Sequence, residues 1–185
     1  VRSGSYLLIS QFRVGSMMMR LNNDRPDASM LWKGQSRSEL PHLTDGLHAM
    51  MSTPIIIGDY LYGVDSYGEL RGIDAATGER LWQSEGVTPQ GRFGTAYFVR
   101  NGDRYFVTND AGELVIARFS PEGYEEIDRT SLLAPTLNTQ GGASGRWSDR
   151  SVLWSHPAFA NGHVVARNDR EVIRASLVAA DYAVD

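Results

Sequence analysis

Short runs of apolar and β-branched residues alternate with small clusters of turn-forming residues along most of the chain. The clearest series spans four such runs, at residues 53–57, 60–64, 70–73 and 80–83. Runs of this length and composition, bounded by glycine, aspartate or serine, are typical of β-strands. We find no stretch with the 3.6-residue apolar period of a helix. The sequence therefore predicts an all-β chain.

Two Asn-Gly pairs add further hairpins to this pattern. Asn101-Gly102 and Asn161-Gly162 each stand between two apolar runs. Both residues of such a pair accept the left-handed backbone conformation of a type I′ turn, which makes the pair a strong hairpin signal. The second half of the chain is therefore predicted to repeat the strand pattern of the first half.

The eleven residues 72–82 form a recognisable unit, Gly-Ile-Asp-Ala-Ala-Thr-Gly-Glu-Arg-Leu-Trp. Asp74 and Thr77 suit a tight turn because their side chains can bond nearby backbone amides. Gly78 suits the same turn because glycine accepts a positive φ. Trp82 follows as an apolar anchor. We expect a corner between two strands, closed by an indole.

Weaker copies of this unit recur along the chain, starting at Asn22, Ala117 and Ala175. In the first copy, Asp24 and Trp32 hold the aspartate and tryptophan places, whereas Ile127 stands at the tryptophan place of the second. The four starts, at residues 22, 72, 117 and 175, are 50, 45 and 58 residues apart. Spacing in that range is what one four-stranded propeller blade needs. The chain is therefore predicted to be a β-propeller of antiparallel four-stranded blades.

The copies predict one partial propeller over residues 1–185, with about four blades at approximately 1–34, 50–85, 94–130 and 152–185 and long connectors at 33–52 and 131–151. Gly4-Ser5 corresponds to the turn Gly58-Asp59, so the first strand of the first blade would lie before Val1. A severed first blade favours the C-terminal half of a larger ring of seven or eight blades. The missing strands or blades would come from the rest of the chain or from a partner chain, because bare sheet edges promote aggregation.

Composition narrows the classes of function. The net charge is −4, and the 18 basic residues are scattered rather than gathered into a patch, which argues against nucleic-acid binding. The absence of cysteine excludes disulfides and thiolate metal sites. No apolar run reaches the length of a membrane span, and no signal peptide is visible.

The Asp-x-x-Thr-Gly-x-x-x-Trp corner, preceded by Ile-Ile-Gly-Asp-Tyr-Leu-Tyr-Gly-Val, resembles the repeat of the PQQ-like β-propellers. That superfamily includes quinoprotein alcohol dehydrogenases, the non-catalytic outer-membrane assembly lipoprotein of the BamB type and many exported propellers. The resemblance implies a tryptophan docking motif, in which the indoles of Trp82 and Trp32 pack between adjacent blades. It also implies a periplasmic or extracellular location.

The resemblance leaves a dehydrogenase with pyrroloquinoline quinone (PQQ) and Ca²⁺ as the alternative function. Such an enzyme needs oxygen ligands for Ca²⁺ and an aspartate as general base. The residues that could be recruited are Asp65, Asp74, Asp110, Asn138 and Asp149. The first three occupy turn positions, where a structural role is the default. The adjacent cysteine pair that caps the quinone in many of these enzymes is missing. We therefore predict no catalytic residue and no cofactor.

Other catalytic patterns are absent from the sequence. The four histidines, His42, His48, His156 and His163, form no spacing known for zinc, and we predict no metal site. Neither a Gly-x-Ser-x-Gly elbow nor a cysteine nucleophile is present.

Two long connectors offer recognition elements instead. Residues 135–149 contain a glycine-rich hinge followed by Arg146, Trp147 and Asp149, without the Lys-Ser/Thr ending of a phosphate loop. The connector 33–52 carries Met50-Met51 and covers the same or the opposite face. Propeller loops on one face commonly form binding sites. The sequence therefore predicts a non-catalytic binding or scaffold module of an exported protein, which presents loops to a protein or carbohydrate partner.

Overall fold

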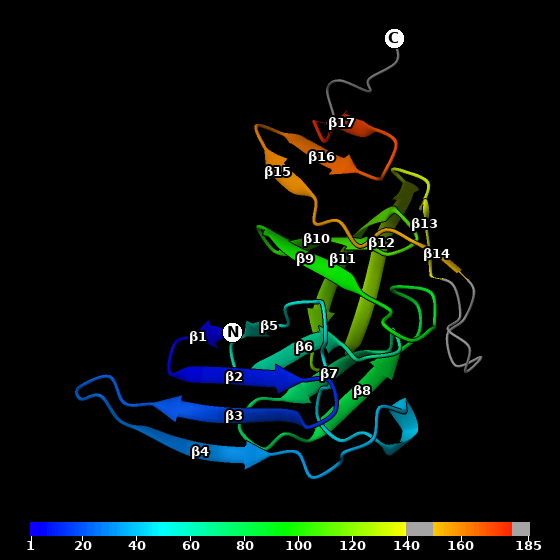
Figure 1. Cartoon of the computed structure of the whole chain (residues 1–185). Coiled ribbons are helices and arrows are strands. Elements are labelled where there is room, and N and C mark those ends of the chain that lie inside the picture. Colours follow the sequence, from blue (N-terminus) through cyan, green and yellow to red (C-terminus); the bar gives the residue numbers. More distant parts are fainter. Residues whose placement is uncertain (140–149, 179–185) are drawn as a thin grey trace.

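The computed structural model describes residues 1–139 and 150–178, and almost all of its regular structure is β-strand. Four antiparallel sheets are stacked one on the next in chain order, from the bottom to the top of Figure 1. Within each sheet the strands follow one another in sequence order. The prediction of an all-β chain built from propeller blades is confirmed, and we call the four sheets blades 1 to 4.

The first three blades have four strands each. Blade 1 contains β1 (Arg2–Ser3), β2 (Tyr6–Gln11), β3 (Gly15–Leu21) and β4 (Ala28–Lys33). Blade 2 contains β5 (Ile55–Ile57), β6 (Tyr60–Val64), β7 (Leu70–Asp74) and β8 (Arg80–Ser84). Blade 3 contains β9 (Ala96–Asn101), β10 (Arg104–Asn109), β11 (Glu113–Ser120) and β12 (Gly123–Ser131).

Blade 4 is described as three strands, β15 (Ala158–Ala160), β16 (His163–Arg167) and β17 (Val172–Ser176). Two of the connectors also hold regular structure. The short 3₁₀ helix η1 (Pro41–Leu43) lies in the connector between blades 1 and 2. β13 (Leu137–Thr139) pairs with β14 (Arg150–Val152) in the connector that was expected to be irregular. Main-chain pairing therefore holds the two ends of that connector together.

The start of blade 1 differs from the expectation. The first strand was predicted to lie before Val1, but β1 pairs with β2 through Arg2 opposite Leu7 and Ser3 opposite Tyr6. The turn between them has Gly4 at φ 55°, as expected for a glycine-containing hairpin. Two residues are therefore enough to supply a short first strand to this blade.

The corner between β7 and β8 has the geometry that its sequence suggests. One oxygen of Asp74 accepts hydrogen bonds from the amides of Ala76 and Thr77, at 2.9 and 2.8 Å, and from the Thr77 hydroxyl at 2.9 Å. Gly78 follows at φ 79°, where a side chain would be strained. The corner is thus fixed by local bonds before any other blade contacts it.

The indole of Trp32, on β4, joins blade 1 to this corner. Its Nε1 donates a hydrogen bond of 2.9 Å to the carbonyl of Ala75 in blade 2. A Cβ atom on Gly78 would lie 2.6 Å from the indole ring, so only glycine lets the ring approach this closely. Tyr6 adds a second link, a 3.1 Å bond from its hydroxyl to the carboxylate of Asp59.

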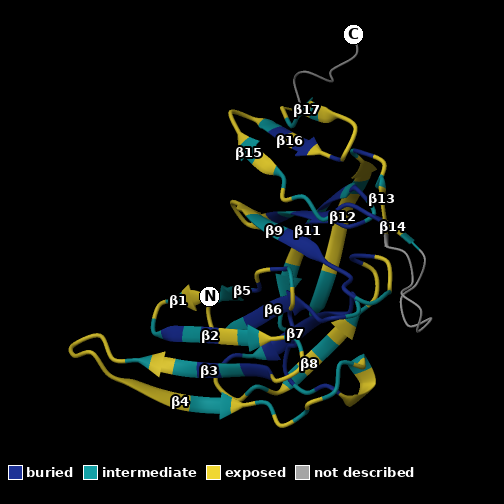
Figure 2. Cartoon of the chain, in the orientation of Figure 1, coloured by how far each residue is buried: buried dark blue, intermediate teal, exposed yellow. Residues whose placement is uncertain are grey.

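Trp82, on β8, makes the corresponding link between blades 2 and 3. Its Nε1 donates a 2.9 Å hydrogen bond to the carbonyl of Ser120, at the turn between β11 and β12. Its ring packs on Tyr62, with the ring centroids 5.8 Å apart, and Tyr62 in turn stacks on Phe119. Buried residues are concentrated in inner strands such as β6 and β7, which are dark blue in Figure 2. Burial raises the pKa of Tyr62 to about 12.

Among the described residues, no equivalent indole joins blades 3 and 4. The strand register places Trp32 opposite Met18 and Trp82 opposite Gly72, with Leu31 and Leu81 at the bulge next to each tryptophan. In blade 3 the bulge residue is Ile127, and the residue paired like the tryptophans is Asp128. The expectation that Ile127 holds the tryptophan place is therefore wrong by one position. An exposed carboxylate stands there instead.

These contacts predict the effect of changes at Trp82. Trp82→Ala should lower the free energy of unfolding by about 3 kcal/mol, because it removes buried ring contacts and leaves a cavity. Trp82→Phe should lower the free energy of unfolding in two ways, through the smaller ring and through the lost hydrogen bond to Ser120. The lost hydrogen bond should account for about 1 kcal/mol of the decrease. Urea denaturation followed by circular dichroism measures both values.

Leu81→Ala is the matched control, since Leu81 neighbours Trp82 on the same strand but is 40% exposed. It should cost less than about 1 kcal/mol. Equal losses for Trp82→Ala and Leu81→Ala would contradict the assignment of Trp82 to the blade interface.

Candidate functional site

The turns between the second and third strands of blades 1 to 3 lie at the same end of the sheets as the connectors between blades, on the right of Figure 1. We call this end the connector face. The opposite end carries the hairpins between the first and second strands and the Asp74 corner, and we call it the hairpin face. Four loops from separate blades meet at the connector face, which makes it the candidate binding surface.

A fully buried guanidinium anchors the connector face. Arg71, on β7, is bonded to two carboxylates, with Nε 2.6 Å from Glu69 and an Nη atom 3.0 Å from Asp65. Neither Arg71 nor Asp65 has any exposed side-chain surface. Burial removes the hydrating water from the guanidinium and from both carboxylates. Their mutual attraction and hydrogen bonds compensate for that loss.

The same guanidinium holds the connector between blades 1 and 2 on the sheet. The Nη2 atom that contacts Asp65 also donates to the Thr44 hydroxyl at 2.7 Å and to the Pro41 carbonyl at 3.0 Å, and Nη1 donates to the Gly46 carbonyl at 2.9 Å. Asp65 also accepts from the amide of His48 at 2.6 Å. The path of residues 41–48 is therefore set by side chains of blade 2.

Asp110 has a comparable role in blade 3. Its carboxylate accepts from the Thr88 hydroxyl at 2.8 Å, from the Thr95 amide at 3.2 Å and from Arg150 at 2.7 Å. Asp110 is fully buried, so these three donors replace its water. The connectors on both sides of blade 3 are thus bonded to one carboxylate.

Glu39 forms a partly buried counterpart of these sites, with 19% of its side chain exposed. Its carboxylate lies 2.7 Å from Arg92 and 3.7 Å from Arg13. The Arg92 guanidinium lies over the rings of Phe12 and Phe93, at 5.5 and 4.7 Å from their centroids. These residues come from blade 1 and from two different connectors, so the cluster joins three loops at the surface.

His48 lies beneath this cluster and is fully buried. Its Nδ1 is 3.0 Å from the carbonyl of Phe12, and its Nε2 is 3.8 Å from a carboxylate oxygen of Asp45. A Cβ atom on Gly15 would lie 2.9 Å from Nε2, so the glycine at this turn makes room for the imidazole. The predicted structural role of histidine agrees with this packing.

Asp45 closes the next turn of the connector. Burial alone would raise the pKa of Asp45, but hydrogen bonds from the amides of Gln35, at 2.6 Å, and Ser36, at 3.1 Å, outweigh it and hold this pKa below its ordinary value. The ionised carboxylate is therefore the form that the folded connector favours.

The structure separates the residues that the sequence singled out. Asp74, Thr77, Gly78, Trp82 and Trp32 lie in the corners and interfaces described above, away from the connector loops. Arg146, Trp147 and Asp149, the expected recognition loop, lie outside the described residues.

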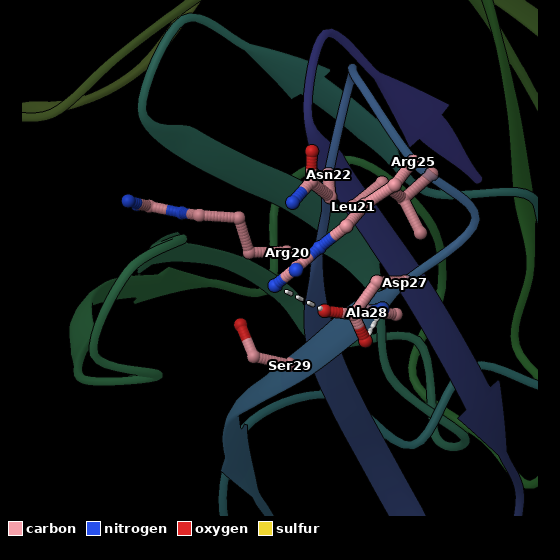
Figure 3. A pocket seen from close by; sticks show the side chains of 7 residues that line it. All are labelled: Arg20, Leu21, Asn22, Arg25, Asp27, Ala28 and Ser29. Carbon is pink, nitrogen blue, oxygen red and sulfur yellow. Dashed lines mark hydrogen bonds and ion pairs between the residues drawn. The ribbon is translucent and has the colours of Figure 1, made fainter.

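Asp24 does not act as Asp74 does. Its own amide donates to the side chain of Asn22 at 2.9 Å, and the amide of Asn22 bonds the carbonyl of Asp27. Asn22 thus makes the turn bonds that Asp74 makes in blade 2, and Asp24 lies within the turn. Figure 3 shows a pocket on this hairpin, where Arg25 and Asp27 form an ion pair of 3.2 Å. One exposed hairpin supplies every residue of this pocket.

The candidate ligands for Ca²⁺ do not converge either. Asp65 and Asp110 are bonded to arginines in separate blades, Asp74 closes its corner, and Asn138 lies in β13. Among residues 1–139 and 150–178, no group of three or more histidine and acidic side chains is placed to bind a metal. The described residues therefore do not fit a PQQ and Ca²⁺ site.

Sequence reasoning missed Arg71 and the Glu39 cluster. Arg71 had one visible signal, a charged residue within an otherwise apolar run. Glu39, Arg92 and Phe12 had none, because their contacts join positions far apart in the chain.

Comparison with known proteins identifies the type of repeat. A family model described as outer membrane protein assembly factor BamB matches residues 18–156 and 67–181. No curated protein matches the chain. The solved structure of BamB from Moraxella catarrhalis aligns with a TM-score of 0.57 and 13% identity, over 94% of this chain and 47% of that one.

A putative 6-phosphogluconolactonase from Bacteroides fragilis aligns with a TM-score of 0.47 and 13% identity, over 90% of this chain and 46% of that one, which is too weak to carry an argument. The chain thus spans about half the length of each of these two solved structures.

The burial of Arg71 predicts a large effect on stability. Arg71→Leu should lower the free energy of unfolding by about 3–5 kcal/mol, because it leaves the carboxylates of Asp65 and Glu69 buried without their cation. Arg37→Leu, at an exposed position of the same connector, should change it by less than about 0.5 kcal/mol. Chemical denaturation of both variants measures the difference, and similar small losses would contradict the anchoring role.

The lowered pKa of Asp45 predicts a pH dependence. A carboxylate whose folded pKa is depressed contributes stability above its unfolded pKa and loses it as the pH falls through the folded value. Asp45→Asn should therefore be less stable than the wild type at pH 7, by about 1 kcal/mol for the weakened amide bonds. The difference should shrink below pH 3.8, the ordinary pKa of aspartate. Thermal melts between pH 2.5 and 7 test this, and a constant difference would contradict it.

Proposed function

This chain belongs to the PQQ-like repeat family described as outer membrane protein assembly factor BamB, and from that premise we propose that it is a non-catalytic binding module of an exported protein. Its partner is a protein of the outer membrane assembly apparatus, as the family description suggests, and its place is the periplasm. In the part of the chain that the structure describes, no helix has the length and apolar character needed to cross a bilayer.

One observation carries this proposal, the exposed apolar side chains of the connector face. Leu43 is 55% exposed and Met50 is 49% exposed, and Val14 and Leu40 are 38% and 40% exposed. Apolar side chains that surround a charged cluster are typical of protein-binding surfaces. Arg13, at the edge of the Glu39 cluster, adds a charge that an acidic group of the partner can meet.

The connector face is also held in place before binding. Residues 41–48 are bonded to Arg71 and Asp65, and the amides of Gln35 and Ser36 are bonded to Asp45. A loop that is already ordered loses little conformational entropy when a partner binds. This favours a scaffold that presents a fixed surface.

The proposal includes no bound quinone and no Ca²⁺. Asp65 and Asp110 already compensate arginines, and Asp65 and Arg71 are both fully buried. If either carboxylate bound a Ca²⁺ ion instead, its arginine would lose the carboxylate that pairs with it. Leaving a buried guanidinium without its counter-charge is energetically costly. The oxygen donors are therefore committed to holding the loops.

Site-specific photo-crosslinking tests the binding surface. We replace Leu43 with a photoreactive residue and irradiate cells of the organism from which the protein comes. We expect a crosslink to a protein of the outer membrane assembly apparatus, which mass spectrometry identifies. Met30, on β4, is the matched control, because it is similarly apolar and 60% exposed but lies outside the connectors. Crosslinks of equal yield from both positions, or from Met30 alone, would show that the connector face is not the binding surface.

A further inference from the structure

A cleft of about 410 Å³ opens on the hairpin face between blades 3 and 4, away from the connector face. The β9–β10 hairpin forms one side and the β15–β16 hairpin forms the other. This volume lies in the range of about 300–1,000 Å³ that is typical of ligand pockets. It occurs at the interface where Asp128 replaces the tryptophan found in blades 1 and 2.

The floor of the cleft is aromatic. Phe106 of blade 3 and Phe159 of blade 4 stack with centroids 5.1 Å apart and planes inclined by only 6°. Both rings are partly exposed and line the cleft. Stacked or edge contacts with a further aromatic ring stabilise beyond the effect of the area that they bury. The floor therefore favours an aromatic group.

The rim of the cleft is basic and polar. Arg100 and His163 line it together with the amide side chains of Asn101 and Asn161, and no acidic residue is among the lining residues. Arg100 donates through Nε to the carbonyl of Gly102, and among the described residues no carboxylate pairs with it. This differs from the connector face, where Arg71 and Arg92 each have a carboxylate partner.

We propose that this cleft binds a partner peptide through an aromatic side chain with a carboxylate next to it. The aromatic ring packs on Phe106 and Phe159, in place of the indole that the chain itself supplies at the other two interfaces. The carboxylate meets Arg100, which pairs with no carboxylate in the ranges 1–139 and 150–178. The cleft lies between the tips of two exposed hairpins, so a peptide can cross it with both of its ends in solvent.

The probe for this site is a fluorescently labelled peptide with the sequence Asp-Trp-Asp, with blocked ends, followed by fluorescence anisotropy. We expect it to bind at least tenfold more tightly than Asp-Ala-Asp, which lacks the ring, and than Lys-Trp-Lys, which reverses the charge. If indole-3-acetate competes as tightly as the unlabelled peptide, the site takes small molecules and the peptide proposal is wrong.

Two single variants locate the binding. Arg100→Glu should weaken the Asp-Trp-Asp peptide at least tenfold. Arg2→Glu is the matched control, because Arg2 makes the same bond, from Nε to the carbonyl of Gly4 at 3.3 Å, in the corresponding hairpin of blade 1. The Arg2→Glu variant should bind the Asp-Trp-Asp peptide as tightly as the wild type does. Equal effects of the two variants would overturn the proposal.

Phe159→Leu tests the aromatic floor separately. It should reduce the preference for Asp-Trp-Asp over Asp-Ala-Asp at least threefold, with the circular dichroism spectrum unchanged. A folded variant that keeps the full preference would overturn the role of the two rings. The photo-crosslinks from Leu43 should be unaffected by Arg100→Glu, since they report on the opposite face.

Discussion

The contact between an indole and the glycine corner of the next blade sets the spacing of the first two blades. Trp32 can lie against Gly78 because glycine both permits the positive φ of the corner and leaves space for the ring. The hydrogen bond to Ala75 then fixes the direction of the indole. Together with the bond from Tyr6 to Asp59, this contact holds the two sheets in one relative orientation. The loops of the connector face are positioned as a result.

The sequence was sufficient to predict the strands, the blades and the turn residues, because these depend on local patterns. Alternating runs and Asn-Gly pairs place the hairpins, and Asp74 with Gly78 places the corner. The register of blade 3 was not predictable in this way. The turn between β11 and β12 differs from the Asp74 corner, so the residue that pairs like the two tryptophans is Asp128, although all three blades carry the same bulge.

The connector face was beyond prediction for a different reason. Its defining contacts join Glu39 to Arg92 and Arg71 to Thr44, and no local pattern records which distant partner a charged residue will meet. The aspartates that the sequence suggested for a metal are used for this purpose instead. Asp65 bonds a buried arginine and a connector amide, which explains why an acidic residue in a turn need not indicate catalysis.

The two faces differ in how their charges are compensated, and this difference suggests a division of roles. On the connector face, Arg71 and Arg92 are paired with carboxylates of the same chain, and apolar side chains such as Leu43 and Met50 are exposed. At the hairpin face between blades 3 and 4, Arg100 has no such partner among the described residues, and two phenyl rings are left partly open. A charge that the described part of the chain leaves without a carboxylate is available to a ligand. Where the described residues place no indole between two blades, as between blades 3 and 4, the space that it would fill can serve as a binding site.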